Sequence, residues 1–375
     1  MTKTTLIHLE FLRGAAALVV LASHTTAHIP FLSNSILRNT TNFGTEAVAV
    51  FFALSGFVMA HSQHNRPKTR SQFLRNRIIR IYPTYFTALA LAYSVGAVTN
   101  NFPSHWMDIV FNLIFAGSIQ HHFARLPATN LALWSLTFEM SFYALFSLCI
   151  VQKKVSIQRL ITWSICSIAA LLIYPYNVTQ SGLDFFLSIL AFSCSWLIGY
   201  FAYSINLSTF IPISLPLLAM IPAASRLPYD LIQSPLKFCV IALLTISYFK
   251  SAQHIRSSPK AIHGVTLLSL ISLIAFFSKA QPKNIILYSL LPLVVFALCY
   301  SRNTGTLLQS PFIRTISLII GRTSYSLYAL HLPLIFLAAW LDSVIGYILL
   351  PPALALLVWA VEYRIQPLIT MLTRR

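Results

Sequence analysis

The chain contains about a dozen apolar runs, each close to the length that crosses a lipid bilayer. A transmembrane helix needs roughly 20 mostly apolar residues, because each residue adds about 1.5 Å to a helix that must cross about 30 Å of hydrocarbon. Of the 375 residues, 57% are hydrophobic and 9% are charged, whereas soluble domains are about one quarter charged. The runs lack the period-two alternation of outer-membrane barrel strands. We therefore expect an all-α polytopic transmembrane bundle forming a single membrane domain over residues 1–375.

About 10–12 of the apolar runs are expected to be spans. They lie near residues 11–29, 44–62, 81–98, 131–151, 158–175, 183–204, 208–224, 235–250, 262–278, 284–300, 323–341 and 344–362. A weaker run covers residues 106–119.

The positive charge of the chain predicts its topology. The net charge of +18 comes from 26 basic and 8 acidic residues, and the basic residues gather in short loops. Cytoplasmic loops of membrane proteins carry such an excess of Lys and Arg, so we expect a membrane-lipid environment and no nucleic-acid partner. The loops at 61–80 and 152–159 should lie on the same side, which requires an even number of spans between them. The run at 106–119 is therefore expected to be re-entrant or interfacial.

The same rule extends to the remaining loops and to both ends of the chain. On the cytoplasmic side of the membrane we expect Lys250, Arg256, Lys260, Arg302, Arg314, Arg374 and Arg375. Both termini of the chain are therefore expected in the cytoplasm. The first apolar run lacks the small-residue cleavage pattern of a signal peptide, so it should remain as a helix.

The cysteines indicate neither disulfides nor a metal site. All five lie in or beside apolar runs without metal-ligand spacing, so we interpret them as small packing residues. They are Cys149, Cys166, Cys194, Cys239 and Cys299.

The first apolar run carries an arginine and a histidine on one helical face. Arg13 and His24 are eleven residues apart, close to three whole turns and about 16 Å along a helix. Arg13 could extend to the membrane interface or face a polar interior. His24 could form an interhelical hydrogen bond or serve as a base, because neutral imidazole takes a proton near neutral pH.

Two further polar positions stand out in apolar surroundings. Arg77 and Arg80 share a helical face at a cytoplasmic entrance, where they could anchor the helix or bind phosphates. Glu139 lies inside an apolar run and needs a polar partner, for which an imidazole, Arg13 and a sugar hydroxyl are candidates. Nearby Trp134 could belong to an interfacial aromatic belt.

Small and aromatic residues complete the candidate set. Ser55 and Gly56, within FFALSGF, are small enough to allow close helix packing. Tyr325, Tyr328 and His331 recur at three-residue spacing on one face, where His331 could be catalytic, structural or a substrate contact.

Together these motifs resemble the acyltransferase family 3 of membrane proteins, bacterial O-acyltransferases that modify surface sugars. The resemblance covers nearly the whole chain and rests on five motifs in order. They are the arginine–ten residues–histidine pattern from Arg13 to His24, FFxLSGF from Phe51, the pair Arg77 and Arg80, WSLxxE from Trp134 through Ser135 to Glu139, and SYSLYxxH from Ser324 to His331.

The resemblance implies O-acyl transfer, acetyl in most cases, from cytoplasmic acyl-coenzyme A to a hydroxyl of a surface or exported polysaccharide or glycolipid. Acetyl-coenzyme A would be a co-substrate, with no permanently bound cofactor and no metal. His24 would be the essential histidine, Arg13 and Glu139 would support it, and Arg77 and Arg80 would hold the donor. Family members often carry an acid where this chain has Ala49.

Two readings from other classes compete with an enzyme. A secondary transporter would use His24 and Glu139 as proton relays, although the chain shows no convincing internal repeat of the kind that transporters often carry. A non-catalytic partner of polysaccharide assembly would retain the motifs without chemistry.

Overall fold

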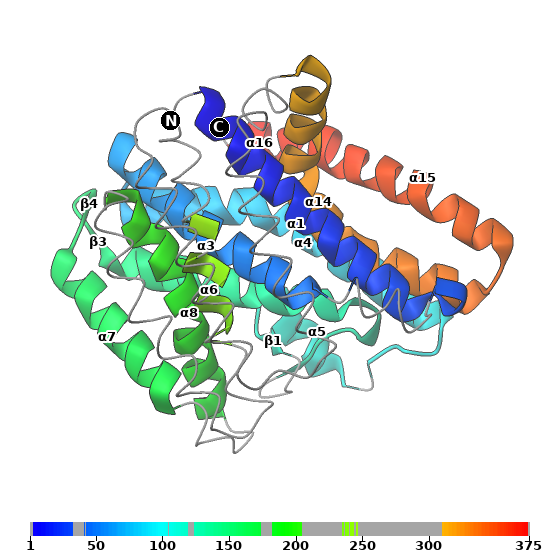
Figure 1. Cartoon of the computed structure of the whole chain (residues 1–375). Coiled ribbons are helices and arrows are strands. Elements are labelled where there is room, and N and C mark those ends of the chain that lie inside the picture. The colour runs from blue at the N-terminus through cyan, green and yellow to red at the C-terminus, as the bar shows by residue number, and fades with distance from the viewer. Residues whose placement is uncertain are drawn as a thin grey trace, which may run out of the picture.

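A computed structural model describes residues 3–32, 41, 43–103, 105–118, 124–173, 182–204 and 310–373, together with scattered positions between 235 and 246. This part of the chain is a bundle of long helices with two minimal strand pairs (Figure 1). Its helices are α1 (Lys3–His28), α3 (Gly44–Asn65), α4 (Arg70–Val98), α5 (Trp106–Leu113), α6 (Trp134–Cys149), α7 (Ile157–Ile173), α8 (Gly182–Ser204), α14 (Pro311–Leu341), α15 (Val344–Ala360) and α16 (Gln366–Thr373).

Short elements join these helices. They are the 3-10 helices η1 (Pro30–Leu32) and η2 (Ala128–Leu133), the parallel pair β1 (Gly117–Ser118) and β2 (Ala124–Arg125), the antiparallel pair β3 (Ile150–Val151) and β4 (Lys154–Val155), and the π-helical turn η4 (Val361–Ile365).

Among the described residues, seven helices are long and apolar enough to cross a membrane. The expected polytopic helical bundle is therefore confirmed. The run predicted at 158–175 forms α7, an apolar helix of 17 residues that falls just short of span length. The runs predicted at 208–224, 262–278 and 284–300, with their basic loops, lie outside the described residues, and the run at 235–250 is described only in part.

The structure places the two basic loops at 61–80 and 152–159 at one end of the bundle. The Gln63 side-chain amide donates to the carbonyl oxygens of Lys68 and Lys153, at 2.9 and 3.0 Å. The Arg75 guanidinium hydrogen-bonds to the carbonyl of Thr373 near the end of α16. We call this the basic end, defined by Arg66, Lys68, Arg70, Lys153 and Lys154. The expectation that the two loops share one side agrees with this arrangement.

The weak run at 106–119 does not form a helix of span length. It folds into the eight-residue helix α5 followed by β1. The Asn112 amide donates to the carbonyl of Arg125 at 2.7 Å, and Asp108 accepts from the Arg125 backbone at 2.9 Å. Trp106 and Ile114 are exposed. These polar ties on one side and apolar side chains on the other fit an interfacial helix better than a crossing one.

Close helix crossings occur at glycines. A Cβ atom on Gly56 of α3 would overlap the carbonyl oxygen of Trp196 on α8, and one on Gly199 would overlap the carbonyl of Ala53. The same is true of Gly321 on α14, which packs against the backbone of Glu10 on α1. The interpretation of Gly56 as a packing residue is thus confirmed, and two pairs of helices are held in fixed register.

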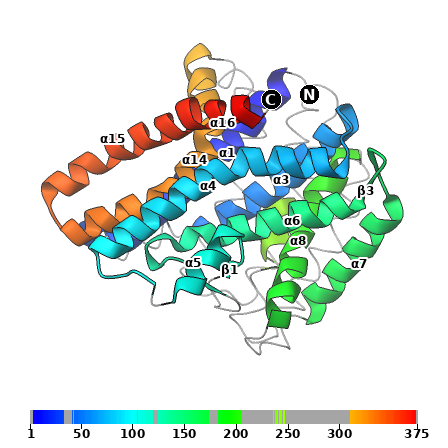
Figure 2. The same cartoon turned by 180° about the vertical axis from the view of Figure 1, so that it is seen from behind.

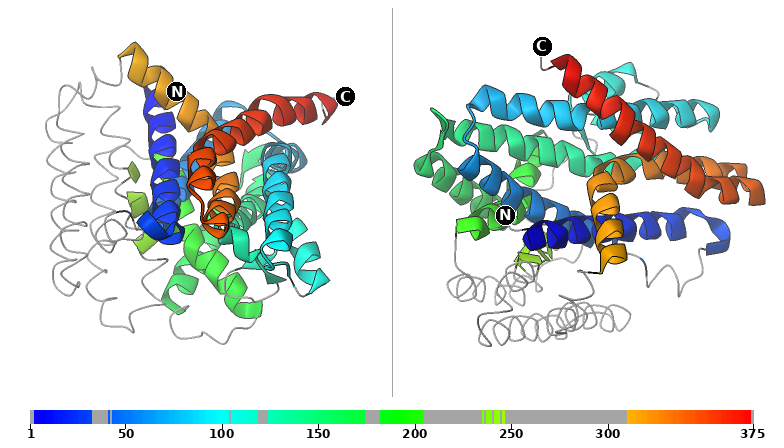
Figure 3. Two further views of the ribbon diagram at one scale, coloured as in Figure 1. Left: turned by 90° about the vertical axis from the view of Figure 1, so that its right-hand side faces the viewer. Right: turned by 90° about the horizontal axis from the view of Figure 1, so that it is seen from above.

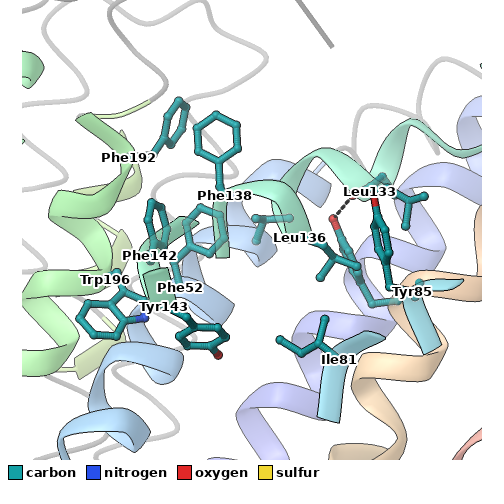
Figure 4. Close-up of a cluster of buried hydrophobic side chains, with 14 of the residues drawn as sticks. Phe52, Ile81, Tyr85, Leu133, Leu136, Phe138, Phe142, Tyr143, Phe192 and Trp196 are labelled. Atoms are coloured by element: carbon teal, nitrogen blue, oxygen red, sulfur yellow. Dashed lines mark hydrogen bonds between the residues drawn. The ribbon is translucent and has the colours of Figure 1, made fainter. Parts of the chain in front are cut away.

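An aromatic cluster fills the space between α3, α6 and α8 (Figure 4). Phe52, Phe142 and Trp196 are almost completely buried there. Trp134 packs edge-on against Phe52 and Phe138, so its ring belongs to this cluster rather than to an interfacial belt. In Figure 4 the Tyr143 hydroxyl points away from the rings of Phe52, Phe142 and Trp196.

Helix α4 lies between α6 and the C-terminal helices, as Figure 2 shows from behind. The Gln366 amide donates to the carbonyl of Ile79 at 2.7 Å and so ties the start of α16 to α4. Helix α15 lies at the periphery of the bundle (Figure 3), and most of its surface is exposed. Helix α15 is therefore the least able of the long helices to enclose a site.

Candidate active site

A cavity of about 150 Å³ lies among α1, α3, α4, α6 and α14. Its lining combines apolar side chains with cations, one carboxylate and several hydroxyl groups. The polar members are Arg13, Ser55, Arg77, Arg80, Ser135, Glu139, Tyr143, Tyr325 and Tyr328. Five helices distant in sequence thus bring most of the predicted site residues to one place.

The three arginines of the cavity differ in how their charge is balanced. Arg80 forms an ion pair of 2.7 Å with Glu362 of the π-helical turn η4, and the other oxygen of Glu362 accepts from the Ser326 hydroxyl at 2.7 Å. Arg13 lies 4.0 Å from Glu10, one turn earlier on α1. Arg80 therefore forms a close ion pair with Glu362, whereas the ion pair between Arg13 and Glu10 is at the distance limit for a salt bridge.

Of the three arginines that line the cavity, Arg77 forms no salt bridge with any described residue. Its Nε atom is buried and makes no hydrogen bond to any described residue, and its guanidinium carbon lies 5.9 Å from the centre of the Tyr143 ring. Just outside the membrane, burial and the neighbouring Arg77 and Arg66 lower the pKa of Lys68. The positive charge at the basic end of the bundle can therefore attract an anion, and the Arg77 guanidinium has N–H donors available to bind it.

Glu139 is paired with a phenol. The Tyr143 hydroxyl, one turn further along α6, donates to Glu139 at 2.5 Å. Since that bond uses the phenol proton, the 2.8 Å contact between Tyr143 and Ser55 has Ser55 as donor, and Ser55 accepts from the Trp196 indole at 3.2 Å. Among the described residues Glu139 does not pair with an imidazole, because it lines the cavity whereas His24 and His331 do not.

The two predicted histidines meet outside the cavity lining. His24 of α1 and His331 of α14 place Nδ1 and Nε2 2.7 Å apart, with nearly parallel rings whose centres are 5.0 Å apart. Nδ1 of His331 lies 2.7 Å from the carbonyl of Tyr328 and 3.2 Å from that of Leu327. We call His24 and His331 the histidine pair. His331 is buried, and His24 is partly exposed.

Tyr328 lies between the cavity and the histidine pair. Its ring lines the cavity, and its centre is 6.0 Å from that of His331. Its hydroxyl contacts the Ser135 hydroxyl and the Ala132 carbonyl, both at 2.7 Å. Arg13 and His24 remain about 16 Å apart along α1. The site therefore has two parts, a cationic cavity toward the basic end and a histidine pair beyond it.

The other predicted positions have clear places. Tyr325 lines the cavity and donates to the carbonyl of Ile81 at 3.0 Å. Ala49, where the resembling family often has an acid, is completely buried, and the nearby Glu46 forms an ion pair with Lys237.

Sequence reasoning missed Tyr143, Ser326 and Glu362. Glu362 is one of eight acids in the chain, and it falls at the end of the apolar run 344–362. The rule that acids in apolar runs need polar partners could have found it. Tyr143 follows Glu139 at i+4, so helical spacing already placed the two side chains on one face.

Comparisons with known proteins agree with this picture. The model of a family described as an acyltransferase domain matches residues 6–361. Over 178 residues the chain is 33% identical to Acyltransferase MdmB of Streptomyces mycarofaciens, and this aligned region covers 45% of this chain and 46% of that protein. Over 107 residues it is 31% identical to the Exopolysaccharide production protein ExoZ of Rhizobium meliloti (strain 1021), covering 28% of this chain and 33% of that one.

A third relative is Protein 2 in picA locus of Rhizobium radiobacter, 33% identical over 119 residues, or 30% of this chain and 58% of that one. The chain thus spans 33% to 58% of the length of these curated relatives. No solved structure matches the chain.

The ion pair between Arg80 and Glu362 gives a testable expectation for stability. Glu362 has 11% of its side chain exposed and Arg80 has 36%, so the loss of Arg80 leaves a poorly solvated carboxylate, and the loss of Glu362 removes the ion-pair partner of Arg80. We expect Arg80→Met and Glu362→Met each to lower the free energy of unfolding in detergent micelles by about 1–3 kcal/mol. The double variant should cost less than the sum of the two. Additivity within about 0.5 kcal/mol would show that the pair is not coupled.

Proposed function

The chain belongs to the acyltransferase family matched above, and from that premise we propose that it moves an acyl group from acyl-coenzyme A to a hydroxyl of an exported polysaccharide or glycolipid. The observation that carries the proposal is the two-part site, in which Arg77 forms no salt bridge with any described residue and Nε2 of His24 forms no hydrogen bond with any described residue. The names of two relatives, an acyltransferase and an exopolysaccharide production protein, support the reaction class and the kind of acceptor.

The donor would bind from the basic end. Positive loops favour the cytoplasmic side, so we propose a multi-pass protein of the bacterial inner membrane with its basic end in the cytoplasm, where acyl-coenzyme A is made. Arg77 would bind the donor's phosphates, because guanidinium pairs well with phosphate. Arg13 and Arg80 would add to the positive field, and Glu139 would orient the arriving chain through its remaining oxygen. The extended pantetheine arm would connect phosphates bound at Arg77 of α4 to the reacting nitrogen of His24 on α1.

The chemistry would take place at Nε2 of His24, by one of two routes. In the direct route, the acceptor hydroxyl gives its proton to Nε2 while its oxygen bonds to the thioester carbon. The carbon–sulfur bond then breaks, and coenzyme A leaves with that proton. In the carrier route, Nε2 bonds to the thioester carbon and coenzyme A leaves as the thiol with the ring proton. The acceptor oxygen then takes the acyl group, and its proton returns to the ring.

The position of His24 favours an acceptor that comes from the end of the bundle opposite the basic end. His24 lies one turn before the end of α1 and keeps part of its surface exposed. A donor from the basic end and an acceptor from the other end would meet at this ring. Neither route therefore requires the acyl donor to leave the cytoplasmic side.

We expect His24→Gln to abolish acyl transfer. Glutamine keeps a hydrogen-bonding group but can neither take the proton nor carry the acyl group at neutral pH. The assay is transfer of radiolabelled acetyl groups from acetyl-coenzyme A to acceptor glycan by purified protein in lipid vesicles. His64→Gln is the matched control, because His64 is an exposed histidine near the end of α3. Retained turnover in His24→Gln would show that His24 does not carry the chemistry and would favour the transporter or assembly-partner hypothesis.

We expect Arg77→Ala to weaken binding of coenzyme A about ten- to a hundredfold, since each lost charge-assisted hydrogen bond costs about 1.5–3 kcal/mol. Isothermal titration of detergent-purified protein with coenzyme A measures this. Arg70→Ala is the control, because Arg70 begins the same helix, is exposed, and does not line the cavity. An equal loss in both variants would indicate general attraction by the basic end instead of a site at Arg77.

A further inference from the structure

The hydrogen bonds around His331 determine which of its ring nitrogens carries hydrogen. Nδ1 faces two carbonyl oxygens, those of Tyr328 at 2.7 Å and Leu327 at 3.2 Å. A carbonyl oxygen can only accept, so Nδ1 must be the N–H donor. In a neutral imidazole the other nitrogen, Nε2, then has its lone pair free to accept.

The imidazole of His331 is neutral because it is buried without a counter-ion among the described residues. Its side chain is 1% exposed, in the middle of an apolar helix. The structure records no salt bridge between His331 and a carboxylate among the described residues. A buried imidazolium without a counter-ion is costly. Nε2 of His331 is therefore an acceptor, and the 2.7 Å contact with His24 needs its hydrogen from Nδ1 of His24.

We infer that His331 is a positioning residue that holds neutral His24 in the Nδ1–H tautomer and directs its Nε2 lone pair to the reacting acyl group. This inference rests on the proposed function, because it assigns the second histidine of the same site a task in the same reaction. Nε2 of His24 makes no hydrogen bond to any described residue. The free nitrogen is thus the one that either route requires.

The register of two parallel helices makes this pairing possible. Gly14 of α1 packs on Ile320 and Gly321 of α14, with distances from 3.1 to 3.4 Å for an added Cβ atom. His24 lies ten residues beyond Gly14, and His331 lies ten residues beyond Gly321. Because both helices rise equally per residue, the close contact at the glycines brings the two rings opposite each other.

The pairing also stabilises the charge that forms during the reaction. When Nε2 of His24 takes the acceptor proton, the ring becomes a cation, and its Nδ1–H bond to His331 becomes charge-assisted and stronger. The acid of a serine-protease triad fixes a tautomer in the same manner. Here a neutral partner does so, and no further charge has to be buried beside the ring.

Two amide substitutions separate this task from a structural one. The amide of Gln at position 331 can place an acceptor where Nε2 of histidine lies, whereas the shorter Asn reaches only the place of Nδ1. We expect His331→Gln to keep most of the turnover number of acyl transfer. His331→Asn should lose about ten- to a hundredfold in kcat with KM for acetyl-coenzyme A unchanged, because the orienting bond to His24 is lost.

If His331 only locked its own helix through the Tyr328 carbonyl, Asn would be the better replacement and the order would reverse. Equal activity of the two variants, or the reversed order, would overturn the inference. His64→Asn provides the control for an unrelated histidine.

A spectroscopic measurement tests the same inference without any turnover. Nitrogen-15 spectra of histidine-labelled protein distinguish the two neutral tautomers, and the signals of His24 are found by their loss in His24→Gln. We expect the Nδ1–H form in the wild-type protein and in His331→Gln, and a mixture in His331→Asn. An Nε2–H form in the wild type would overturn the inference. If the protein transferred no acyl group at all, the proposed function would fail while this measurement still decided the tautomer.

Discussion

Lipid offers no hydrogen bonds, so every polar side chain inside this bundle must find its partner within the protein. In the described structure, short chains of contacts provide such partners at several positions. The Trp196 indole, Ser55, Tyr143 and Glu139 form one of them across α8, α3 and α6. Arg80, Glu362 and Ser326 form another, which joins α4, η4 and α14. Arg77 and the ring nitrogen Nε2 of His24 make no such contact with a described residue, and we propose that both bind the substrates.

Membership of the family indicates acyl transfer, and the positions of Arg77 and His24 indicate how the acyl donor would lie in the site. Arg77 of α4, which forms no salt bridge with any described residue, lies toward the basic end of the bundle, and His24, with its free ring nitrogen, lies near the end of α1. Tyr328 connects the two parts, since its ring lines the cavity and lies next to His331. A donor whose charged and reactive ends are far apart suits such a site. The enzyme that we propose would therefore hold its donor by one end and acylate at the other.

The fold class and most of the site could be predicted from the sequence, because hydrophobicity and charge act over short stretches of chain. Run lengths revealed the spanning helices, and helical spacing placed Tyr325 and Tyr328 on one face. Partners across helices could not be predicted, since they depend on register and crossing angle. Nothing in the local sequence joins His24 to His331 or Arg80 to Glu362. Glu139 illustrates the same limit, because its partner is a phenol one turn away instead of an imidazole.

The central claim is that one donor molecule extends from Arg77 to His24, and a structure with a thioether analogue of acetyl-coenzyme A tests it most directly. This analogue keeps the carbonyl but lacks the cleavable bond. The account predicts phosphate oxygens hydrogen-bonded to Arg77 and the carbonyl carbon about 3–3.5 Å from Nε2 of His24, the separation of a near-attack conformer. An analogue bound with its phosphates away from Arg77, or with its carbonyl beyond reach of His24, would contradict it.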